Sequence, residues 1–488
     1  MQSLKLRKCY TAFLVLTFLV IPLTMVSAAS NSLLFDPSIC SAPITETWYG
    51  KEVTYRACEG IVYVSIPVDI TYQTMNVYIP EAYFNGKKIN GHTAKNAPIF
   101  MPNKVGGYNP GQPATVTEES VRYALSEGYV VAAPGARGKT QDYGRAPAGI
   151  VDLKAAVRYL RYNDKAMPGN AEKIISNGTS AGGAMSSLLG ATGNNSDYEP
   201  YLQEIGAADA RDDIFAASCY CPITNLNNSD MAYEWLFNGE HIWYWFMGPT
   251  SLTEEQIVLS DLLKAMFPAY LNRLSLRECK PGKKNKCTQL TLDEYGEGNF
   301  NDYAESFVIA SAQKALDNEA DFTGPEFDWM TIENGKVIDI DLAGYAAYVT
   351  RMKPVPAFDN VDLAAGGTWE NILFGNVEEG FPSKHFTRFS FERDIEGANA
   401  YPIADAKIVK MMSPMDYIGT KGSTTTKNWR IRHGTADRDT SIAIPIILTT
   451  KLRNAGFDVD FAMPWGQGHG GDYDLEELFA WIDMISKH

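Results

Sequence analysis

The chain has too few positively charged residues for a protein that binds nucleic acid or a membrane surface. Its 488 residues include 43 Lys and Arg against 58 Asp and Glu, for a formal net charge of -15. A surface of that sign repels a phosphate backbone and anionic lipid, so we expect no nucleic-acid partner and no electrostatic membrane docking. Internal repeats and low-complexity linkers are also lacking, and the 45% hydrophobic content is typical of a globular protein.

Long apolar runs are missing everywhere except near the N-terminus, so no later segment is expected to span a bilayer. Residues 12–26 are apolar, follow three basic residues and precede small residues at 27–30. This order is typical of a cleaved secretory signal. An uncleaved anchor is the alternative, but the run is short and contains Pro22. We therefore expect residues 1–29 to be a signal peptide and the protein to be secreted or periplasmic, with no membrane attachment after cleavage.

Cysteine is scarce and has no zinc-binding pattern. The chain has seven cysteines and six histidines, without a CxxC motif or a His pair at ligand spacing, so we expect no metal site and no cofactor. Export permits disulfides. Cys279 and Cys287 flank a turn-rich loop that a bridge could close, and Cys40 and Cys58 form the next candidate pair. Six cysteines outside the signal allow many pairings, so the connectivity stays open.

Strand and helix patterns alternate before and after a long interruption. Buried-strand patterns at 97–101, 128–134 and 214–220 alternate with helical ones, a strand-like pattern covers 62–78, and the alternation resumes near 429. This predicts a parallel sheet with right-handed crossovers. Cys219 and Cys221 lie two apart in the apolar strand-like run that includes 214–220, so they are expected to face one side as small core residues.

Between about residues 224 and 404 the chain changes character. Aromatic residues crowd the stretch 233–246, and a helix with a capping box follows. Most of these aromatics are expected to be core. The economical interpretation is one sheet domain in two parts, 30–223 and 405–488, split by an inserted lid at 224–404.

Gly178-Thr179-Ser180-Ala181-Gly182 matches the motif G-x-S-x-G. In α/β-hydrolases this motif places serine on a strained turn between a strand and a helix, with the hydroxyl exposed. Five residues can match by chance, and a glycine-rich turn with an ordinary serine is the alternative. The strand pattern before the motif and the small, helix-compatible residues after it favour Ser180 as a nucleophile.

The partners of such a serine follow in the order acid, then histidine. His469 lies in a glycine-rich loop after the last strand pattern, where an imidazole can reach across the strand ends. Asp437 follows the preceding strand pattern and is the expected acid, holding the histidine tautomer. Asp439 could instead cap the next helix or face the substrate. His433 lies within a strand pattern and is expected to be structural.

An oxyanion hole requires two N–H donors. The residue after the nucleophile, Ala181, supplies one in this fold. The second is expected from Gly107 or its neighbour, because residues 102–108 form a glycine-rich loop after a strand pattern. A plain Gly-Gly turn is nearly as good an interpretation of that loop.

Longer motifs indicate a family. The chain resembles the bacterial tannases, tannin acyl hydrolases that cleave galloyl esters, along essentially its whole length after the signal segment. The matching stretches are PNKVGGYNPG (102–111), NGTSAGGA (177–184), DMAYEWLFNG (230–239), TRMKPVPAFD (350–359), IRHGTADRDTSIAIPIIL (431–448) and GDYDLEELFAWID (471–483). Matches within the expected lid matter most, because a general esterase would share only the motifs around the three catalytic residues.

The resemblance implies an α/β-hydrolase fold with a large inserted lid, and a carboxylic ester hydrolase acting on gallotannins and alkyl gallates through a galloyl-enzyme. It places the catalytic triad on Ser180, Asp437 and His469. The side chains that it implies for holding the galloyl hydroxyls are Lys353, Glu370 and Asp439. The stretch 364–368 before Glu370 is longer than in the family pattern, which makes that match the weakest.

Two other functions remain open at this point. A feruloyl or other phenolic-acid esterase would share the triad and differ in the ring that it selects. A hydrolase-fold protein that captures polyphenols without turnover is the second, and the complete Ser-His-Asp set argues against it. The sequence indicates neither the preferred tannin nor the oligomeric state.

Overall fold

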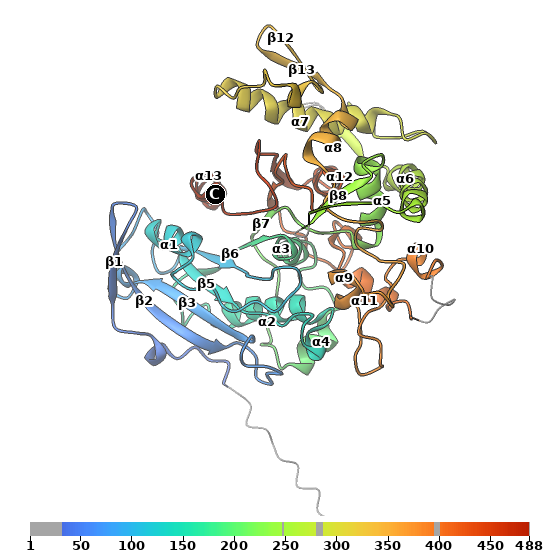
Figure 1. Ribbon diagram of the computed structural model, residues 1–488. Coiled ribbons are helices and arrows are strands. Elements are labelled where there is room, and N and C mark those ends of the chain that lie inside the picture. Colours follow the sequence, from blue (N-terminus) through green and yellow to red (C-terminus); the bar gives the residue numbers. More distant parts are fainter. Residues whose placement is uncertain (1–31, 246–247, 280–285, 395–400, 488) are drawn as a thin grey trace, which may run out of the picture. The chain divides into compact units, whose positions relative to one another are not determined.

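A nine-stranded mixed sheet organises the chain (Figure 1). The computed structural model describes residues 32–245, 248–279, 286–394 and 401–487, so the predicted signal peptide lies outside the described residues. In spatial order the strands are β1 (Ile44–Trp48), β2 (Lys51–Val62), β3 (Thr74–Pro80), β5 (Val130–Pro134), β4 (Pro98–Pro102), β6 (Asn170–Thr179), β7 (Ala216–Tyr220), β14 (Asn428–Arg432) and β15 (Asp458–Ala462).

The sheet is antiparallel at one end and parallel at the other. The neighbours β1, β2, β3 and β5 pair antiparallel, and from β5 to β15 every pairing is parallel. Strands β4, β5, β7 and β14 are buried along their whole length, as expected for parallel strands covered on both faces. The parallel part therefore agrees with the prediction from alternating strand and helix patterns.

The N-terminal strands differ from the sequence prediction. The strand-like pattern over residues 62–78 divides into the end of β2, a loop, and most of β3. Most of β2, and all of β1, precede the predicted pattern. Strand β1 is partly exposed throughout, so its apolar periodicity is weak.

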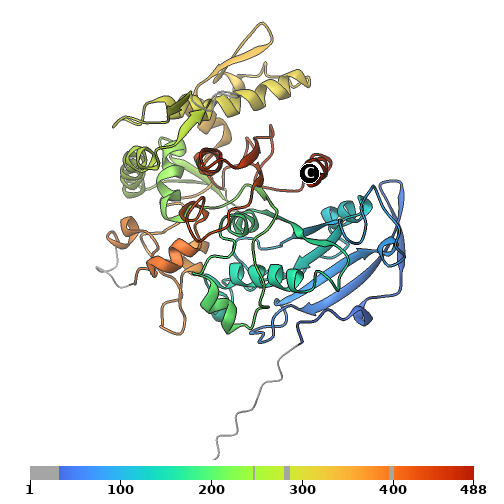
Figure 2. The ribbon, with the colours of Figure 1, turned by 180° about the vertical axis from the view of Figure 1, so that it is seen from behind.

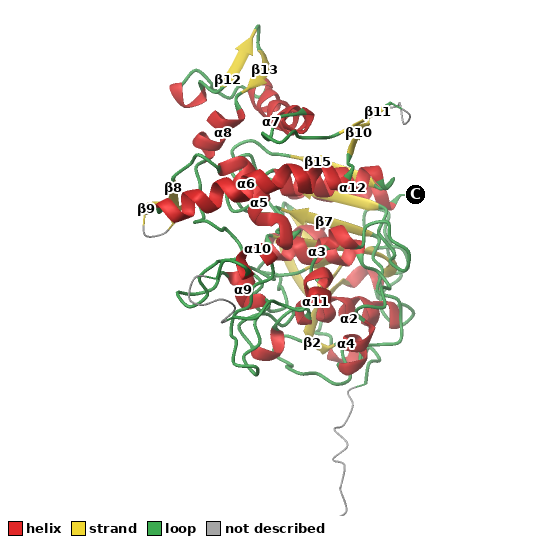
Figure 3. Cartoon of the chain, turned by 90° about the vertical axis from the view of Figure 1, so that its right-hand side faces the viewer, coloured by secondary structure: helices red, strands yellow, loops and turns green. Residues whose placement is uncertain are grey.

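Six helices flank the sheet: α1 (Glu119–Ser126), α2 (Ala148–Tyr162), α3 (Ala181–Ala191), α4 (Glu199–Glu204), α12 (Ala443–Asn454) and α13 (Leu475–Ser486). Helix α3 is buried along its length and packs on β6 and β7 (Figure 3). Its small residues permit that close approach between helix and sheet. The nucleophile motif thus lies where the most buried helix begins.

The chain leaves the sheet after β7 and returns at β14. Between them lie α5 (Leu226–Phe237), α6 (Glu254–Leu274), α7 (Asn299–Asp317), α8 (Leu342–Val349), α9 (Trp369–Leu373), α10 (Arg388–Phe391) and α11 (Ala406–Met411). The strands there are β8 (Ile242–Trp245), β9 (Gly248–Ser251), β10 (Arg277–Cys279), β11 (Cys287–Gln289), β12 (Met330–Glu333) and β13 (Lys336–Ile340), which form three separate hairpins. In the views of Figures 1 and 2, α5 to α8 lie above the sheet.

Two disulfides close short loops, Cys40–Cys58 and Cys279–Cys287, which confirms both expected pairs. Cys219 and Cys221 are buried and unpaired by disulfides. Among the described residues, no helix combines the length and apolar character needed to cross a bilayer.

Candidate active site

Ser180 lies at the turn between β6 and α3, in a backbone conformation that residues other than glycine rarely adopt. Its φ of 62° and ψ of -125° are those of a strained nucleophile turn. Gly178 and Gly182 cross so closely that a Cβ on Gly178 would lie 2.3 Å from the Gly182 carbonyl oxygen. The Ser180 N–H donates to the Tyr220 carbonyl at 3.0 Å, which ties the turn to β7. The two motif glycines therefore allow a geometry that larger residues would prevent.

His469 and Asp437 meet Ser180 although they lie far away in sequence. The Nε2 atom of His469 is 2.8 Å from Ser180 Oγ, and its Nδ1 is 2.9 Å from Asp437 Oδ2. Asp437 is fully buried, whereas the His469 side chain is 22% exposed. The serine, histidine and carboxylate thus form a continuous hydrogen-bonded chain that opens to solvent at the histidine.

Electrostatics beside Ser180 stabilise the positive charge that His469 carries once it accepts a proton, and the negative charge of Asp437. Burial opposes the imidazolium, but the Asp437 charge and hydrogen bond outweigh it, so the pKa of His469 is raised. Burial likewise opposes the carboxylate, and the neighbouring histidines outweigh it, so the pKa of Asp437 is lowered. Such a pair stabilises the imidazolium that forms when a histidine accepts a proton from serine.

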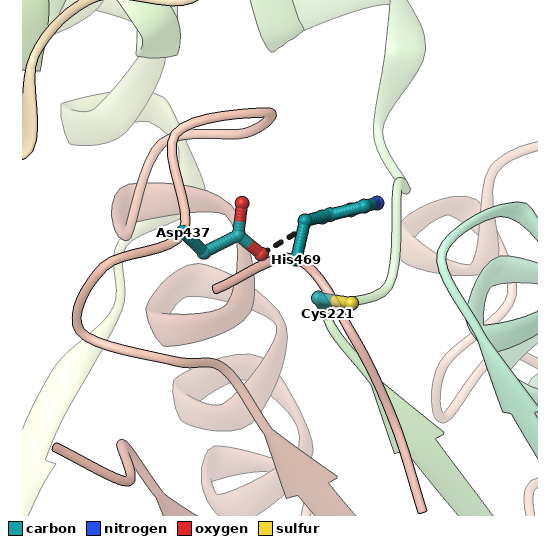
Figure 4. Close-up of side chains that lie close together, drawn as sticks. All are labelled: Cys221, Asp437 and His469. Atoms are coloured by element: carbon teal, nitrogen blue, oxygen red, sulfur yellow. Dashed lines mark hydrogen bonds and ion pairs between the residues drawn. The ribbon is translucent and has the colours of Figure 1, made fainter. Parts of the chain in front are cut away.

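Two further side chains lie against this pair. His433 is buried with Nδ1 3.6 Å from Asp437 Oδ2, and burial lowers its pKa despite the carboxylate, which favours the neutral form. Cys221 follows β7 with a φ of 35°, and its sulfur lies beside His469 (Figure 4). The thiol donates to the Gly470 carbonyl at 3.4 Å. Sequence analysis expected Cys221 only as a core residue, because the turn that brings it to the histidine has no local signal.

In the described part of the chain, one group of side chains could bring three metal-ligand atoms together. It consists of Cys221, Asp437 and His469, whose ligand atoms lie within 4.8 Å of one another. His469 and Asp437 already share a hydrogen bond. The group therefore belongs to the same hydrogen-bonded chain as Ser180.

Ser180 and His469 open onto a cavity of about 620 Å³. Gly107 lines it too, with a φ of 54°, and the Trp369 ring lies against this glycine: a Cβ there would come within 2.4 Å of the indole. Ala181 begins α3 directly after the serine and is buried. Both residues predicted for the oxyanion hole are thus near Ser180, and sequence analysis did not anticipate Trp369.

The three predicted ring-binding side chains meet in the same cavity. It is lined by Lys353, Glu370 and Asp439, and Lys353 Nζ lies 3.0 Å from Asp439 Oδ1. Glu370 belongs to the first turn of α9 and is 5% exposed. Asp439 pairs with the lysine and does not cap α12, whose N-cap residue is Ile442. The weakest match of the sequence analysis, Glu370, therefore lies with the other two.

Opposing effects set the charges at this end of the cavity. Burial raises the pKa of Glu370 and the Asp439 carboxylate adds to this, while Lys353 acts against them. Burial opposes the ammonium of Lys353, but Asp439 and Glu370 outweigh it and raise its pKa. The Lys353 ammonium and the carboxyl groups of Glu370 and Asp439 together provide both donors and acceptors for a ligand that carries several hydroxyl groups.

The aromatic stretch predicted as core divides between two roles. Tyr233, Trp235 and Phe237 are buried in the insertion, as expected. Trp243 and Tyr244 instead line the cavity. Periodicity does not separate these cases, because β8 is a short hairpin strand rather than part of a helix face.

The chain is similar to a family model and to several proteins of known structure. The family model BD-FAE matches residues 92–244. The tannase of Fusobacterium nucleatum is 49% identical, with a TM-score of 0.86, and the alignment covers 93% of this chain and 99% of that one. A tannin acyl hydrolase from Lactobacillus plantarum is 45% identical, with the same coverage and TM-score. A tannin acyl hydrolase in complex with ethyl gallate is 44% identical, again with that coverage and TM-score. A comparison with curated proteins finds no match.

The chain belongs to the tannase family. It is accordingly a carboxylic ester hydrolase with an α/β-hydrolase fold, which confirms the predicted family, enzyme class and fold. Coverage of 93% of the chain includes the segment between β7 and β14 in addition to the sheet. The likeness to tannases therefore extends well beyond what a shared hydrolase core would require.

Proposed function

We propose that this tannase-family chain hydrolyses galloyl esters of tannins and simple gallates, with Ser180, His469 and Asp437 as its catalytic triad. The observation that carries the proposal is one cavity lined both by Ser180, which is hydrogen-bonded to His469, and by a cluster of Lys353 with two carboxyl groups. A galloyl group has matching ends, an ester carbonyl and a trihydroxyphenyl ring. The likeness to a tannin acyl hydrolase in complex with ethyl gallate supports the same substrate class.

Acylation begins when Ser180 Oγ attacks the ester carbonyl and His469 Nε2 takes the hydroxyl proton. Asp437 holds the imidazole in the required tautomer and stabilises its positive charge. The N–H groups of Ala181 and Gly107 donate to the oxyanion, and each such donor is typically worth about 3 kcal/mol in the transition state. Collapse breaks the bond to the alcohol, which leaves with the proton from His469.

Deacylation repeats these steps with water as the nucleophile. His469 takes a proton from the water, whose oxygen attacks the galloyl-enzyme carbonyl. Collapse releases gallic acid and returns the proton to Ser180. No cofactor enters the balance, because water supplies both the hydroxyl group of the acid and the hydrogen of the alcohol.

Ring selection rests on hydroxyl groups. Carboxylates of Glu370 and Asp439 accept hydrogen bonds from phenolic O–H groups, and the Lys353 ammonium donates to phenolic oxygens. A site that pairs with substrate hydroxyls rejects a ring lacking them by up to about 10⁴-fold, since its own polar groups are then left unpaired.

Export forms the second part of the proposal. The predicted signal peptide at residues 1–29 and the two disulfides both support an oxidising compartment outside the cytoplasm. N-terminal sequencing of the protein recovered from the periplasm or medium tests this: a start near residue 30 is expected, and an intact Met1 would refute cleavage.

The decisive assay follows gallic acid release from methyl gallate at neutral pH by chromatography. Wild-type protein should release it, and Ser180→Ala should not. Methyl ferulate is the comparison substrate, and a faster ferulate rate would reverse the choice of ring. Labelling of Ser180 by a fluorophosphonate, lost in Ser180→Ala, excludes a protein that binds without turnover.

A further inference from the structure

Asp359 is a buried carboxylate at the centre of a polar network in the segment between β7 and β14. Its side chain is fully buried and accepts five hydrogen bonds. Oδ1 accepts from Asn371 Nδ2 at 2.7 Å and lies 3.1 Å from His385 Nδ1. Oδ2 accepts from the N–H of Phe386 at 3.0 Å and from the N–H and hydroxyl of Thr387, each at 2.7 Å. Burying a charge is costly unless it is this fully paired.

Asn371 carries this network to the start of α9. Its Oδ1 accepts from the N–H of Asn360 at 3.0 Å and of Thr368 at 3.1 Å, and its own N–H donates to the Thr368 hydroxyl. This capping box determines where the short helix begins. Glu370 precedes Asn371 in the same turn. The location of the Glu370 carboxylate therefore depends on the side chain that Asp359 holds.

The same stretch supports Lys353. Asp230, on α5, accepts from the N–H of Phe358 at 2.7 Å and of Asp359 at 3.1 Å. The Phe358 ring lies under the lysine, with Nζ 3.9 Å from its centroid. Residues 358–359 thus contact Lys353 directly, through the Phe358 ring, and support Glu370 indirectly, through Asp359 and Asn371.

We propose that Asp359 is a positioning residue for the galloyl ring, acting through Asn371 on Glu370. The inference rests on the proposed function, because it assigns Glu370 to ring binding. Hydrogen bonds to a ligand weaken steeply with misplacement, so a binding carboxylate on a five-residue helix needs a rigid support. The buried pair of Asp359 and Asn371 provides it.

The test compares Asn371→Ala with wild type on methyl gallate, with the rate of Ser180 labelling by a small fluorophosphonate as reference. We expect kcat/KM for methyl gallate to fall about tenfold or more, mainly through KM, and the labelling rate to change less than about twofold. Asn163→Ala is the matched control: Asn163 is also buried and holds the Phe35 N–H at 2.8 Å and the Leu33 carbonyl at 2.8 Å, outside the insertion. It should alter melting temperature but not KM.

A double-mutant cycle separates positioning from general stability. In a Glu370→Ala background, Asn371→Ala should cause no further loss of kcat/KM, because the two act on one interaction. If Asn371→Ala folds poorly, Asn371→Asp tests the same contact, because it replaces the amide that donates to Asp359 with a second carboxylate. The exchange Asp359→Asn with Asn371→Asp restores one donor and one charged acceptor, and should recover at least about a third of the lost activity.

Three results would overturn the inference: an unchanged KM in Asn371→Ala, additive losses in the cycle, or no recovery on exchange. Failure of the proposed function looks different, because wild-type protein itself would then release no gallic acid. Normal wild-type turnover, a defective Glu370→Ala and a normal Asn371→Ala would refute the positioning role alone.

Discussion

Replacing Lys353 by Met removes the ammonium from the proposed ring-binding cluster of Lys353, Glu370 and Asp439 while keeping an unbranched side chain. In the native site Nζ lies 3.0 Å from Asp439 Oδ1, with the two side chains 14% and 15% exposed. Glu370 faces the same cavity and is 5% exposed. Without the lysine, Asp439 loses its ion-pair partner, Glu370 loses a nearby positive charge, and a phenolic oxygen loses its donor.

The size of the effect follows from that geometry. At 3.0 Å and an effective dielectric constant of about 20, the pair interacts by about 5 kcal/mol. Part of this is recovered, because water enters the open cavity and one carboxylate takes up a proton. We expect a net loss of about 3 kcal/mol in transition-state binding, or about a hundredfold in kcat/KM for methyl gallate.

The assay measures kcat/KM for methyl gallate and the rate of Ser180 labelling by a fluorophosphonate in the same preparations. Labelling requires the Ser–His chain but no ring hydroxyls, so it should be nearly unchanged in Lys353→Met. A loss below about threefold on methyl gallate would refute the reasoning from the ion pair. Equal losses in both measurements would instead indicate a general structural defect.

Three further variants test separate parts of the site. Asp437→Asn should lower kcat by about 10³-fold or more with little change in KM, because the histidine loses the partner that holds its tautomer; a KM effect alone would contradict this. Gly107→Ala should lower kcat/KM at least about tenfold, since its Cβ would come within 2.4 Å of the Trp369 ring at a φ of 54°, whereas Gly106→Ala meets nothing within 4 Å and should be neutral. The raised pKa of Glu370 means that it takes up a proton at higher pH than an ordinary glutamate, so KM for methyl gallate should rise as pH falls through that value. Glu370→Gln should have a higher KM with a flatter pH dependence, and identical profiles would refute the assignment.

Some of the site could be predicted because local rules place it. The G-x-S-x-G motif located the strained turn, and chain order selected Asp437 and His469 as the partners of Ser180. In the structure, His469 lies 2.9 Å from Asp437 Oδ2 and 2.8 Å from Ser180 Oγ. Their catalytic roles remain predictions that the variants above test. Other contacts had no local signal: Trp369 lies on Gly107 from a distant segment, and Cys221 reaches His469 only through a turn at positive φ.

The amino-acid sequence by itself determined the properties that depend on neighbouring residues: the nucleophile turn, the alternation of strands and helices in the parallel part of the sheet, and the family motifs. Tertiary structure alone decided how the insertion assembles its polar groups. Asp359 is an ordinary acidic residue in the sequence, and only folding brings Asn371, His385 and Thr387 around it. The physical reason is that a buried charge is tolerated only where distant donors converge, and no periodicity along the chain encodes that convergence.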